Sequence, residues 1–262
     1  MKREDLIHPV VTGNKWRKLG PNLRAAREQG LRRVVTFGGA WSNHIAAMAA
    51  AGRLSGFEVI GMIRGEEHLP LNPVLAQAVA DGMRLTYMDR STYRRKHTDE
   101  VIERLRNEFG DFYLVPEGGT NELAVRSCRD IPGEIDLELD LICCAVGTGG
   151  TIAGIAAGLE ADQRALGFSA LKGGELLADE VERLQVAAFG VRQGSWDIEC
   201  GYHFGGFAKR TAVLDAFIAD FAVRHGITLD WVYVAKMLFG VFDLAQRGAF
   251  PDGTRIVAVV TG

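Results

Sequence analysis

Short apolar runs alternate with longer amphipathic stretches along most of the chain. The short runs carry many β-branched or aromatic residues and end near glycine or charged residues, which is typical of buried β-strands. They cover residues 33–39, 57–63, 83–89, 111–119, 140–147 and 254–260. The stretches at 42–56, 72–82 and 98–110 have the periodicity of helices. Because apolar strands alternate with helices, the pattern predicts an α/β fold in which helices cover both faces of a mostly parallel sheet.

The segment VGTGGTIAG, residues 146–154, follows one predicted strand and opens a helix. Ligands of such sheets bind beyond the carboxyl ends of the strands. Successive glycines let backbone N–H groups point inward together, and the helix start adds partial positive charge, so the segment predicts a phosphate site. It lacks the lysine of a Walker loop, and Ile152 replaces the third glycine of a dinucleotide motif. The candidate phosphate-binding residues are Gly147, Thr148, Gly149, Gly150 and Thr151.

The segment FGGAWSNHIAAM, residues 37–48, follows a second predicted strand. Ser42 is the expected N-cap of an alanine-rich helix. Capping explains the serine but not Asn43 and His44 beside it. Three polar side chains at a helix start predict a pocket for a carboxylate or a ring hydroxyl.

The segment TGNKWRKLG, residues 12–20, places Lys15 at the start of a helix, where a cation is electrostatically unfavourable. A solvated basic helix would account for Arg17 alone. We expect the same field to lower the pKa of the Lys15 amine and so to favour a nucleophile. A phosphate loop, an anion-binding helix start and such a lysine together indicate pyridoxal 5'-phosphate held as a Schiff base.

Charge and cysteine content exclude several classes of protein. The formal net charge of -3 gives no basic footprint for nucleic acid or an anionic membrane, and no apolar run nears the roughly 18 residues of a membrane helix. The four cysteines form no CxxC pair, and no spacing indicates a metal site. We expect reduced cysteines, with Cys143 and Cys144 on opposite faces of a strand, in a cytoplasmic protein.

Seven motifs occur in a family order: KREDL, GNKWRKL, SNH, PEGGTNELAV, VGTGGT, LKGGE and YHFGGFAK. Together they resemble the 1-aminocyclopropane-1-carboxylate deaminase and D-cysteine desulfhydrase family of fold-type II pyridoxal-phosphate enzymes. The resemblance runs through the whole chain and implies a tryptophan synthase β-like fold of two interwoven three-layer α/β domains. It implies a large cofactor-binding domain of residues 1–19 and 116–262, an inserted small domain of residues 20–115, and a homodimer. Compared with the family, both termini are short.

The resemblance also implies roles for single residues near the two helix starts. Lys15 matches the Schiff-base lysine and later base, and Lys18 matches a second lysine of the cofactor site. Asn43 matches the asparagine that faces the ring 3-hydroxyl. Ser42 and His44 match the substrate-carboxylate pocket, in which the serine is also placed to move protons.

Further positions match the C-terminal part of the family site. The resemblance implies cofactor binding by the loop at 147–151 and by Thr261, and catalysis by Tyr233. Phe207 stands where longer members carry a second tyrosine. Tyr202 is the nearby residue that would supply the missing hydroxyl.

Val234, directly after the motif tyrosine, bears on the reaction. The resemblance implies glutamate there in deaminases of the cyclopropane acid and serine or threonine in desulfhydrases. Since valine cannot ionise, β-elimination from D-cysteine, giving pyruvate, ammonia and sulfide, is the favoured reaction. The alternatives are deamination of 1-aminocyclopropane-1-carboxylate to 2-oxobutyrate and ammonia, and a homologue that binds cofactor or amino acid without turnover.

Overall fold

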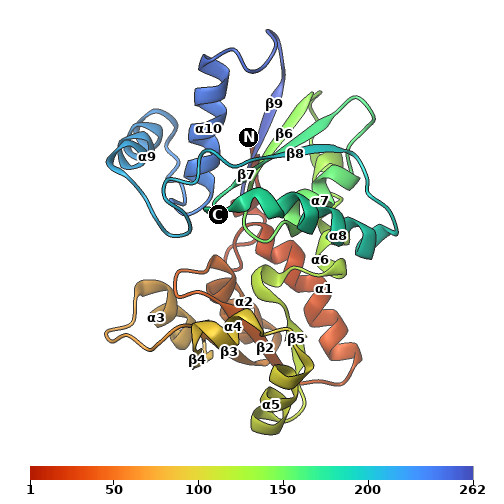
Figure 1. Ribbon diagram of the computed structural model, residues 1–262, viewed down its shortest axis with the longest axis vertical. Coiled ribbons are helices and arrows are strands. Elements are labelled where there is room, and N and C mark those ends of the chain that lie inside the picture. The colour runs from red at the N-terminus through yellow and green to blue at the C-terminus, as the bar shows by residue number, and fades with distance from the viewer. Residues whose placement is uncertain (262) are drawn as a thin grey trace. The chain divides into compact units, whose positions relative to one another are not determined.

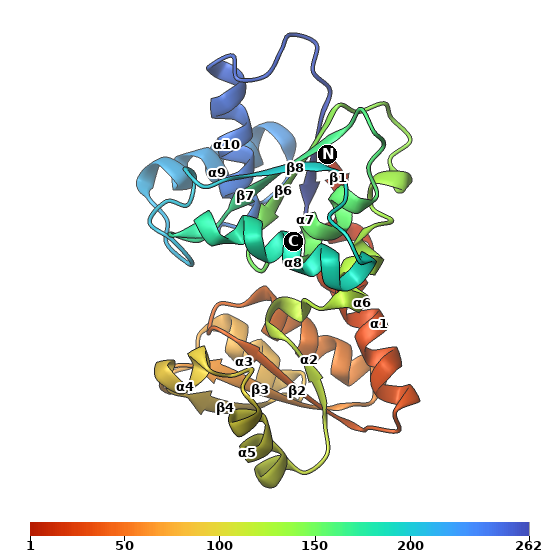
Figure 2. The ribbon, with the colours of Figure 1, turned by 45° about the vertical axis from the view of Figure 1, so that its right-hand side comes forward.

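The chain folds into two units, each built on one parallel β-sheet (Figures 1 and 2). The computed structural model describes residues 1–261. The first unit comprises Met1–His8, Thr12–Asn14 and the residues from Asn121 onward, and the second comprises Pro9–Val11 and Lys15–Thr120.

The junctions differ from the expected domain boundaries, because residues 15–19 and 116–120 lie with the second unit. Leu19 is 1% exposed and belongs to a core cluster of that unit that also contains Val115. Since α1 packs on this core from its first turns onward, the chain joins the second unit earlier than the sequence indicates.

The second unit contains the sheet β4-β3-β2-β5, in which neighbouring strands are parallel. Its strands are β2 (Arg33–Gly38), β3 (Glu58–Arg64), β4 (Arg84–Met88) and β5 (Tyr113–Val115). Its helices are α1 (Asn14–Glu28), α2 (Asn43–Ser55), α3 (Pro73–Ala80), α4 (Arg90–Arg94) and α5 (Asp99–Phe109). One core cluster joins α1, α2 and α3 to the sheet, and another joins α4 and α5 to it. Successive strand residues divide between the clusters, as Val34 and Val35 do, so both faces are covered.

The first unit contains the parallel sheet β1-β9-β6-β7-β8. Its strands are β1 (Lys2–Arg3), β6 (Leu141–Val146), β7 (Arg164–Ser169), β8 (Ser195–Glu199) and β9 (Ile256–Val260). Its helices are α6 (Glu122–Cys128), α7 (Gly150–Ala157), α8 (Leu177–Phe189), α9 (Ala212–His225) and α10 (Val234–Gln246). Short 3-10 turns lie at Glu4–Leu6 (η1), Pro132–Glu134 (η3) and Gly174–Leu176 (η4) in this unit, and at Glu117–Gly119 (η2) in the second unit.

Helices cover both faces of this sheet as well (Figures 1 and 2). One core cluster contains residues of α6, α7 and α8, and the other contains residues of α9 and α10. Cys144 belongs to the first cluster and Cys143 to the second, which confirms that they point to opposite faces of β6. The α/β class and the parallel sheets are therefore confirmed.

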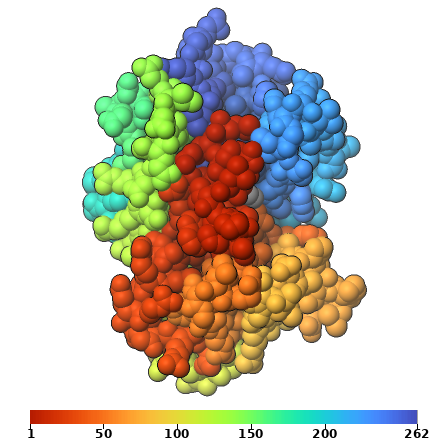
Figure 3. Space-filling model, turned by 180° about the vertical axis from the view of Figure 1, so that it is seen from behind, coloured from red at the N-terminus to blue at the C-terminus, as the bar shows by residue number. Residues whose placement is uncertain are grey.

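The expected strands are all present, but the pattern did not predict three further strands, β1, β7 and β8. The strand expected at 111–119 ends at Val115, since Pro116 and the 3-10 turn η2 follow it. β7 and β8 were not expected: β8 is partly exposed, so its apolar pattern is weak. The residues before α1, red in Figure 3, reach the surface, where Met1 and Leu6 are 55% and 69% exposed. In residues 1–261 no helix is long and apolar enough to cross a membrane.

Candidate active site

The glycine loop between β6 and α7 has the backbone geometry of an anion site. Gly149 has φ +80°, in the left-handed region that favours glycine, and a Cβ there would stand 3.0 Å from Val181 Cγ2. α7 begins at Gly150, so the N–H groups of its first turn have no partner within the helix. Thr151 is buried. Buried N–H groups at a helix start fit a phosphate.

Asn14 joins the start of α1 to this loop. Its Nδ2 donates to Thr151 Oγ1 at 2.7 Å, and the hydrogen bond is buried. Asn14 is the first residue of α1, and Lys15 follows it directly. Only one peptide link therefore separates Lys15 from a residue bonded to the glycine loop.

Tyr233 packs against the first residue of the same loop. A Cβ on Gly147 would lie 3.0 Å from Tyr233 Cε1 and 3.3 Å from its hydroxyl oxygen. The Asp230 carboxylate accepts the backbone N–H groups of Val232, Tyr233 and Val234, at 3.3, 2.7 and 3.4 Å. An aspartate in the turn before α10 therefore fixes the backbone of the tyrosine.

Phe207 lies beside Tyr233, with ring centroids 6.1 Å apart and planes at 62°. Tyr202 is engaged elsewhere, because its hydroxyl donates to Asp243 Oδ2 at 2.6 Å. Burial and the Asp243 carboxylate raise the pKa of Tyr202 to about 12. In this structure Tyr202 therefore does not supply the hydroxyl that Phe207 lacks. Thr261 is buried and follows β9.

Lys15 and Lys18 lie in the first turns of α1, within the second unit. Lys15 is half-buried, whereas Lys18 is only 3% exposed. Lys18 Nζ donates to Thr120 Oγ1 at 3.2 Å. The Lys18 ammonium is therefore buried and held by a hydrogen bond.

Ser42 is the N-cap residue of α2, as expected, but its side chain makes no capping hydrogen bond. Its carbonyl accepts the N–H of Ile45 at 3.0 Å. Asn43 follows as the first residue of α2 and is half-buried. The serine hydroxyl is therefore not used by its own helix.

His44 is buried, and its tautomer follows from two hydrogen bonds of Thr36. Thr36 Oγ1 donates its only proton to the Val115 carbonyl at 2.8 Å and lies 2.7 Å from His44 Nε2. The oxygen must then accept from Nε2–H, which leaves Nδ1 as an unprotonated acceptor. Within residues 1–261, no group pairs with Nδ1.

The charge state of His44 follows from its surroundings. Burial lowers the pKa of His44 well below its usual value, and the charges of Lys15 and Lys18 lower it further. Gly119, at φ +66°, lies beside the Nδ1 edge of the His44 ring, and a Cβ added to this glycine would be 3.5 Å from Nδ1. The structure thus brings together Lys15, Lys18 and a neutral imidazole that accepts a hydrogen bond.

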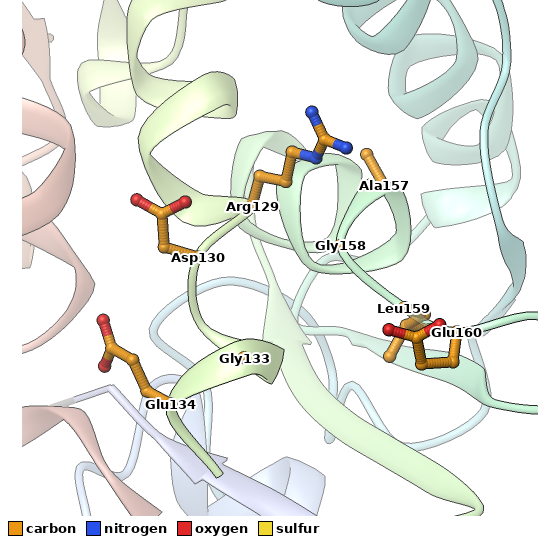
Figure 4. Close-up of a pocket in the computed structure, with 8 residues that line it drawn as sticks. All are labelled: Arg129, Asp130, Gly133, Glu134, Ala157, Gly158, Leu159 and Glu160. Carbon is orange, nitrogen blue, oxygen red and sulfur yellow. The ribbon is translucent and has the colours of Figure 1, made fainter.

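A separate surface pocket of about 590 Å³ lies in the first unit (Figure 4). Arg129, Asp130, Glu134 and Glu160 line it, together with the residues that end α7. It lies at the opposite end of α7 from the glycine loop, about 12 Å away along the helix axis. This pocket is therefore not part of the candidate site.

Three residues of the site, and one buried lysine of α10 outside it, were not predicted from the sequence. Asn14 and Thr36 gave no signal, because their partners are distant in sequence. Asp230 lies in the turn before α10, and Lys236 is a single charge within an apolar helix, so the sequence carried a signal for each.

The side chains present fit pyridoxal phosphate. The buried glycine cradle suits its phosphate, and the lysine that follows Asn14 suits its aldehyde. The unpaired Nδ1 of His44 offers a further acceptor beside the lysines.

Comparisons with known proteins agree with this geometry. The family model described as pyridoxal-phosphate dependent enzyme matches residues 1–262. A protein of Pyrococcus horikoshii named "Putative 1-aminocyclopropane-1-carboxylate deaminase" is 31% identical over 272 residues, which cover 100% of this chain and 83% of that protein. D-cysteine desulfhydrase of Klebsiella pneumoniae is 26% identical over 284 residues, covering 100% and 85%. The crystal structure of an ACC deaminase homologue, 30% identical, superposes with a TM-score of 0.87 and covers 100% of this chain and 83% of that one. The chain therefore belongs to the family of pyridoxal-phosphate-dependent enzymes.

Proposed function

We propose that this enzyme is a lyase that acts on a small amino acid such as D-cysteine and releases pyruvate, ammonia and sulfide. The hydrogen bond from Asn14 to Thr151 carries the proposal, since it ties the residue before Lys15 to the glycine loop. A lysine amine and a phosphate cradle are the two features by which a protein holds this cofactor. The names of the relatives divide between a desulfhydrase and a deaminase, and both belong to such lyases.

The chain's own residues divide the work in this proposal. Bound pyridoxal phosphate would withdraw electrons from the substrate Cα and so acidify its proton. Lys15 would hold the cofactor covalently through Nζ, and its amine, once freed by the substrate amine, would take that proton. The N–H groups of the glycine loop bind the phosphate, and Tyr233, which packs on Gly147, orients the substrate or assists proton transfer.

The α2 start binds the substrate carboxylate through Ser42 and Asn43, whose side chains can donate hydrogen bonds. His44 has a different role in substrate binding. Because its Nδ1 is unprotonated, it accepts a hydrogen bond and does not donate one to a carboxylate. Ser42 also serves as a proton carrier, since its hydroxyl does not cap the helix.

The reaction balances without an oxidant. Loss of the α-proton and of sulfide from Cβ leaves 2-aminoacrylate, and water hydrolyses it to pyruvate and ammonia. Val234, which is fully buried in an apolar cluster, supplies no carboxylate at the position where the resemblance implies glutamate in the deaminases. Deamination of 1-aminocyclopropane-1-carboxylate is the second candidate and rests on the names of relatives such as the Pyrococcus protein.

The first experiment tests the cofactor site without any substrate. Protein mixed with pyridoxal phosphate is reduced with borohydride and digested, and mass spectrometry locates the added mass. We expect it on Lys15 and expect none there in Lys15→Ala. Lys209→Ala removes an exposed lysine and serves as the control. Label spread over exposed lysines would refute the assignment of Lys15.

The second experiment separates the candidate reactions. Sulfide and pyruvate are measured with D-cysteine and L-cysteine, and 2-oxobutyrate with the cyclopropane acid. Sulfide from D-cysteine alone supports the proposal. Release of 2-oxobutyrate alone would replace it with the deaminase. No product from a fully loaded protein would leave a homologue that binds without turnover.

We also propose that the enzyme is a cytoplasmic homodimer. Three of its four cysteines, Cys128, Cys143 and Cys144, are buried in the cores, which suits a reducing compartment. Light scattering on the loaded protein tests the dimer, and a monomeric mass would refute it.

A further inference from the structure

Lys236 is a buried lysine of α10 that none of the roles above uses. Its side chain is 1% exposed, and its Nζ donates to the Gly206 carbonyl at 2.8 Å. Burial lowers the pKa of this amine to about 8, and the Asp230 charge opposes the shift. Burying an ammonium costs free energy that one hydrogen bond to a neutral carbonyl recovers only in part. Global stability alone therefore does not account for a lysine at this position.

The segment that accepts this hydrogen bond has a strained backbone. Phe204 and Ala208 have φ of +51° and +50°, in a region that L-residues other than glycine rarely adopt. Gly205 and Gly206 between them have φ of +94° and +115°. Backbone of this kind persists only where its surroundings fix it, and it is frequent at ligand sites.

Local hydrogen bonds hold only part of this segment. The N–H of Gly206 donates to the His203 carbonyl at 3.0 Å, and the N–H of Lys209 donates to the Gly206 carbonyl at 3.1 Å. The Gly206 carbonyl therefore accepts two donors, one from its own turn and one from Lys236. The Lys236 hydrogen bond joins the turn to α10, and the Phe204 ring also meets Phe239 of that helix edge-on, with ring centroids 5.0 Å apart.

Phe207 connects this turn to the candidate site. It follows Gly206 directly, and its ring meets the Tyr233 ring edge-on. Tyr233 in turn lies against Gly147 of the glycine loop. Since Lys236 and Tyr233 are three residues apart at the start of α10, the helix contacts the turn at two neighbouring points.

We propose that Lys236 is a positioning residue: its hydrogen bond to Gly206 sets the place of Phe207 and, through it, of the Tyr233 ring. The ammonium and the neutral amine both carry N–H donors, so either protonation state can hold the turn. The structural part of this inference stands alone, and its catalytic part rests on the proposed function.

The first test needs no substrate. Lys236→Met keeps the length of the side chain and removes the donor. We expect amide hydrogen exchange in residues 203–209 to rise about tenfold or more, the effect of losing one buried hydrogen bond to a charged group. Exchange in β6 and β7 should not change, and the midpoint of urea unfolding should not fall. Lys209→Met, which removes an exposed cation from the same turn, is the matched control and should match wild type.

The second test uses whichever amino acid the wild-type enzyme turns over. Lys236→Met should lower kcat about tenfold or more with little change in KM or in cofactor affinity, as expected for displaced catalytic geometry. Phe207→Ala, a change at a half-buried ring, should lower kcat similarly. The double variant should be no worse than the poorer single variant, because both changes act on one contact.

Several results would overturn the inference. Unchanged amide hydrogen exchange in residues 203–209 would refute the proposal that the Lys236 hydrogen bond holds this turn. Fully additive effects of the two substitutions on kcat would refute action through Phe207. A fall in unfolding midpoint that accounts for the lost activity would make Lys236 merely structural. If the wild type turns over no amino acid, the proposed function fails, and the exchange measurement still decides whether Lys236 holds the turn.

Discussion

His44 Nε2 and Thr36 Oγ1 lie 2.7 Å apart in the core of the second unit, and this contact fixes the protonation of the imidazole. The Thr36 hydroxyl donates its proton to the Val115 carbonyl, so His44 Nε2–H must donate to Thr36 Oγ1. A neutral imidazole with its lone pair on Nδ1 attracts donors and repels carboxylates. His44 therefore accepts hydrogen bonds at this site, whereas the side chains of Ser42 and Asn43 can donate them, although the three residues are consecutive.

Nitrogen NMR of histidine-labelled protein should find His44 neutral, with the proton on Nε2, at pH 5.5. An exposed histidine would be largely protonated at that pH. Burial and the two lysine charges lower the pKa of His44, so its charged form should appear only at lower pH. In Thr36→Val the acceptor is lost, and the preference for the Nε2–H tautomer should weaken. A His44 ring protonated at pH 5.5 would contradict the assignment.

Asn14 is predicted to govern cofactor affinity. Asn14→Ala removes the buried hydrogen bond to Thr151 and should weaken binding of pyridoxal phosphate about tenfold, equivalent to about 1.4 kcal/mol. Asn14→Asp should weaken it more, because the carboxylate would lie at the helix that receives the phosphate. Fluorescence titration measures both. Asn107→Asp, an exposed change on α5, is the control. Equal affinity of wild type and Asn14→Asp would exclude a phosphate at the glycine loop.

The sequence predicted those features of the candidate site that lie within one continuous segment of the chain. The glycine loop follows a strand and opens a helix, and the helix start at Ser42 does the same. The decisive contacts are not local: Asn14 and Thr151 are 137 positions apart. No periodicity reports such a pair, because each partner lies in a different element. The junction between the units depends in the same way on where Leu19 packs, which no local pattern reports.

The sequence around Lys236 carried a signal with two possible interpretations. Lys236 stands among Val234, Ala235, Met237 and Leu238, all of them buried. A lone lysine in such a run indicates either a buried amine or a helix that turns its charge outward. Only the structure distinguishes these, by showing the hydrogen bond to Gly206.

Gly147 is predicted to control the place of Tyr233. In Gly147→Ala the new Cβ would stand 3.0 Å from Tyr233 Cε1, so the ring must move by a few tenths of an ångström. We expect kcat to fall about tenfold with cofactor affinity nearly unchanged, since small displacements of catalytic groups are costly. Gly133→Ala, where a Cβ meets nothing within 4 Å, should behave as wild type. An unaltered kcat in Gly147→Ala would remove Tyr233 from the catalytic residues.

A substitution at Val234 distinguishes a side chain packed in the core from one that lies beside the cofactor. The side chain is fully buried in an apolar cluster. Val234→Glu would place a carboxylate there and should lower the free energy of unfolding by about 3 kcal/mol or more at pH 8. Burial raises the pKa of such a glutamate above its unfolded value, so the loss should grow as pH rises from 4 to 8 and be smallest at pH 4. Val213→Glu, at a position 60% exposed, should cost less than about 0.5 kcal/mol at either pH. Urea unfolding at pH 4 and 8 measures these differences. A Val234→Glu variant as stable as wild type that also gains 2-oxobutyrate release would place this side chain beside the cofactor instead of in the core.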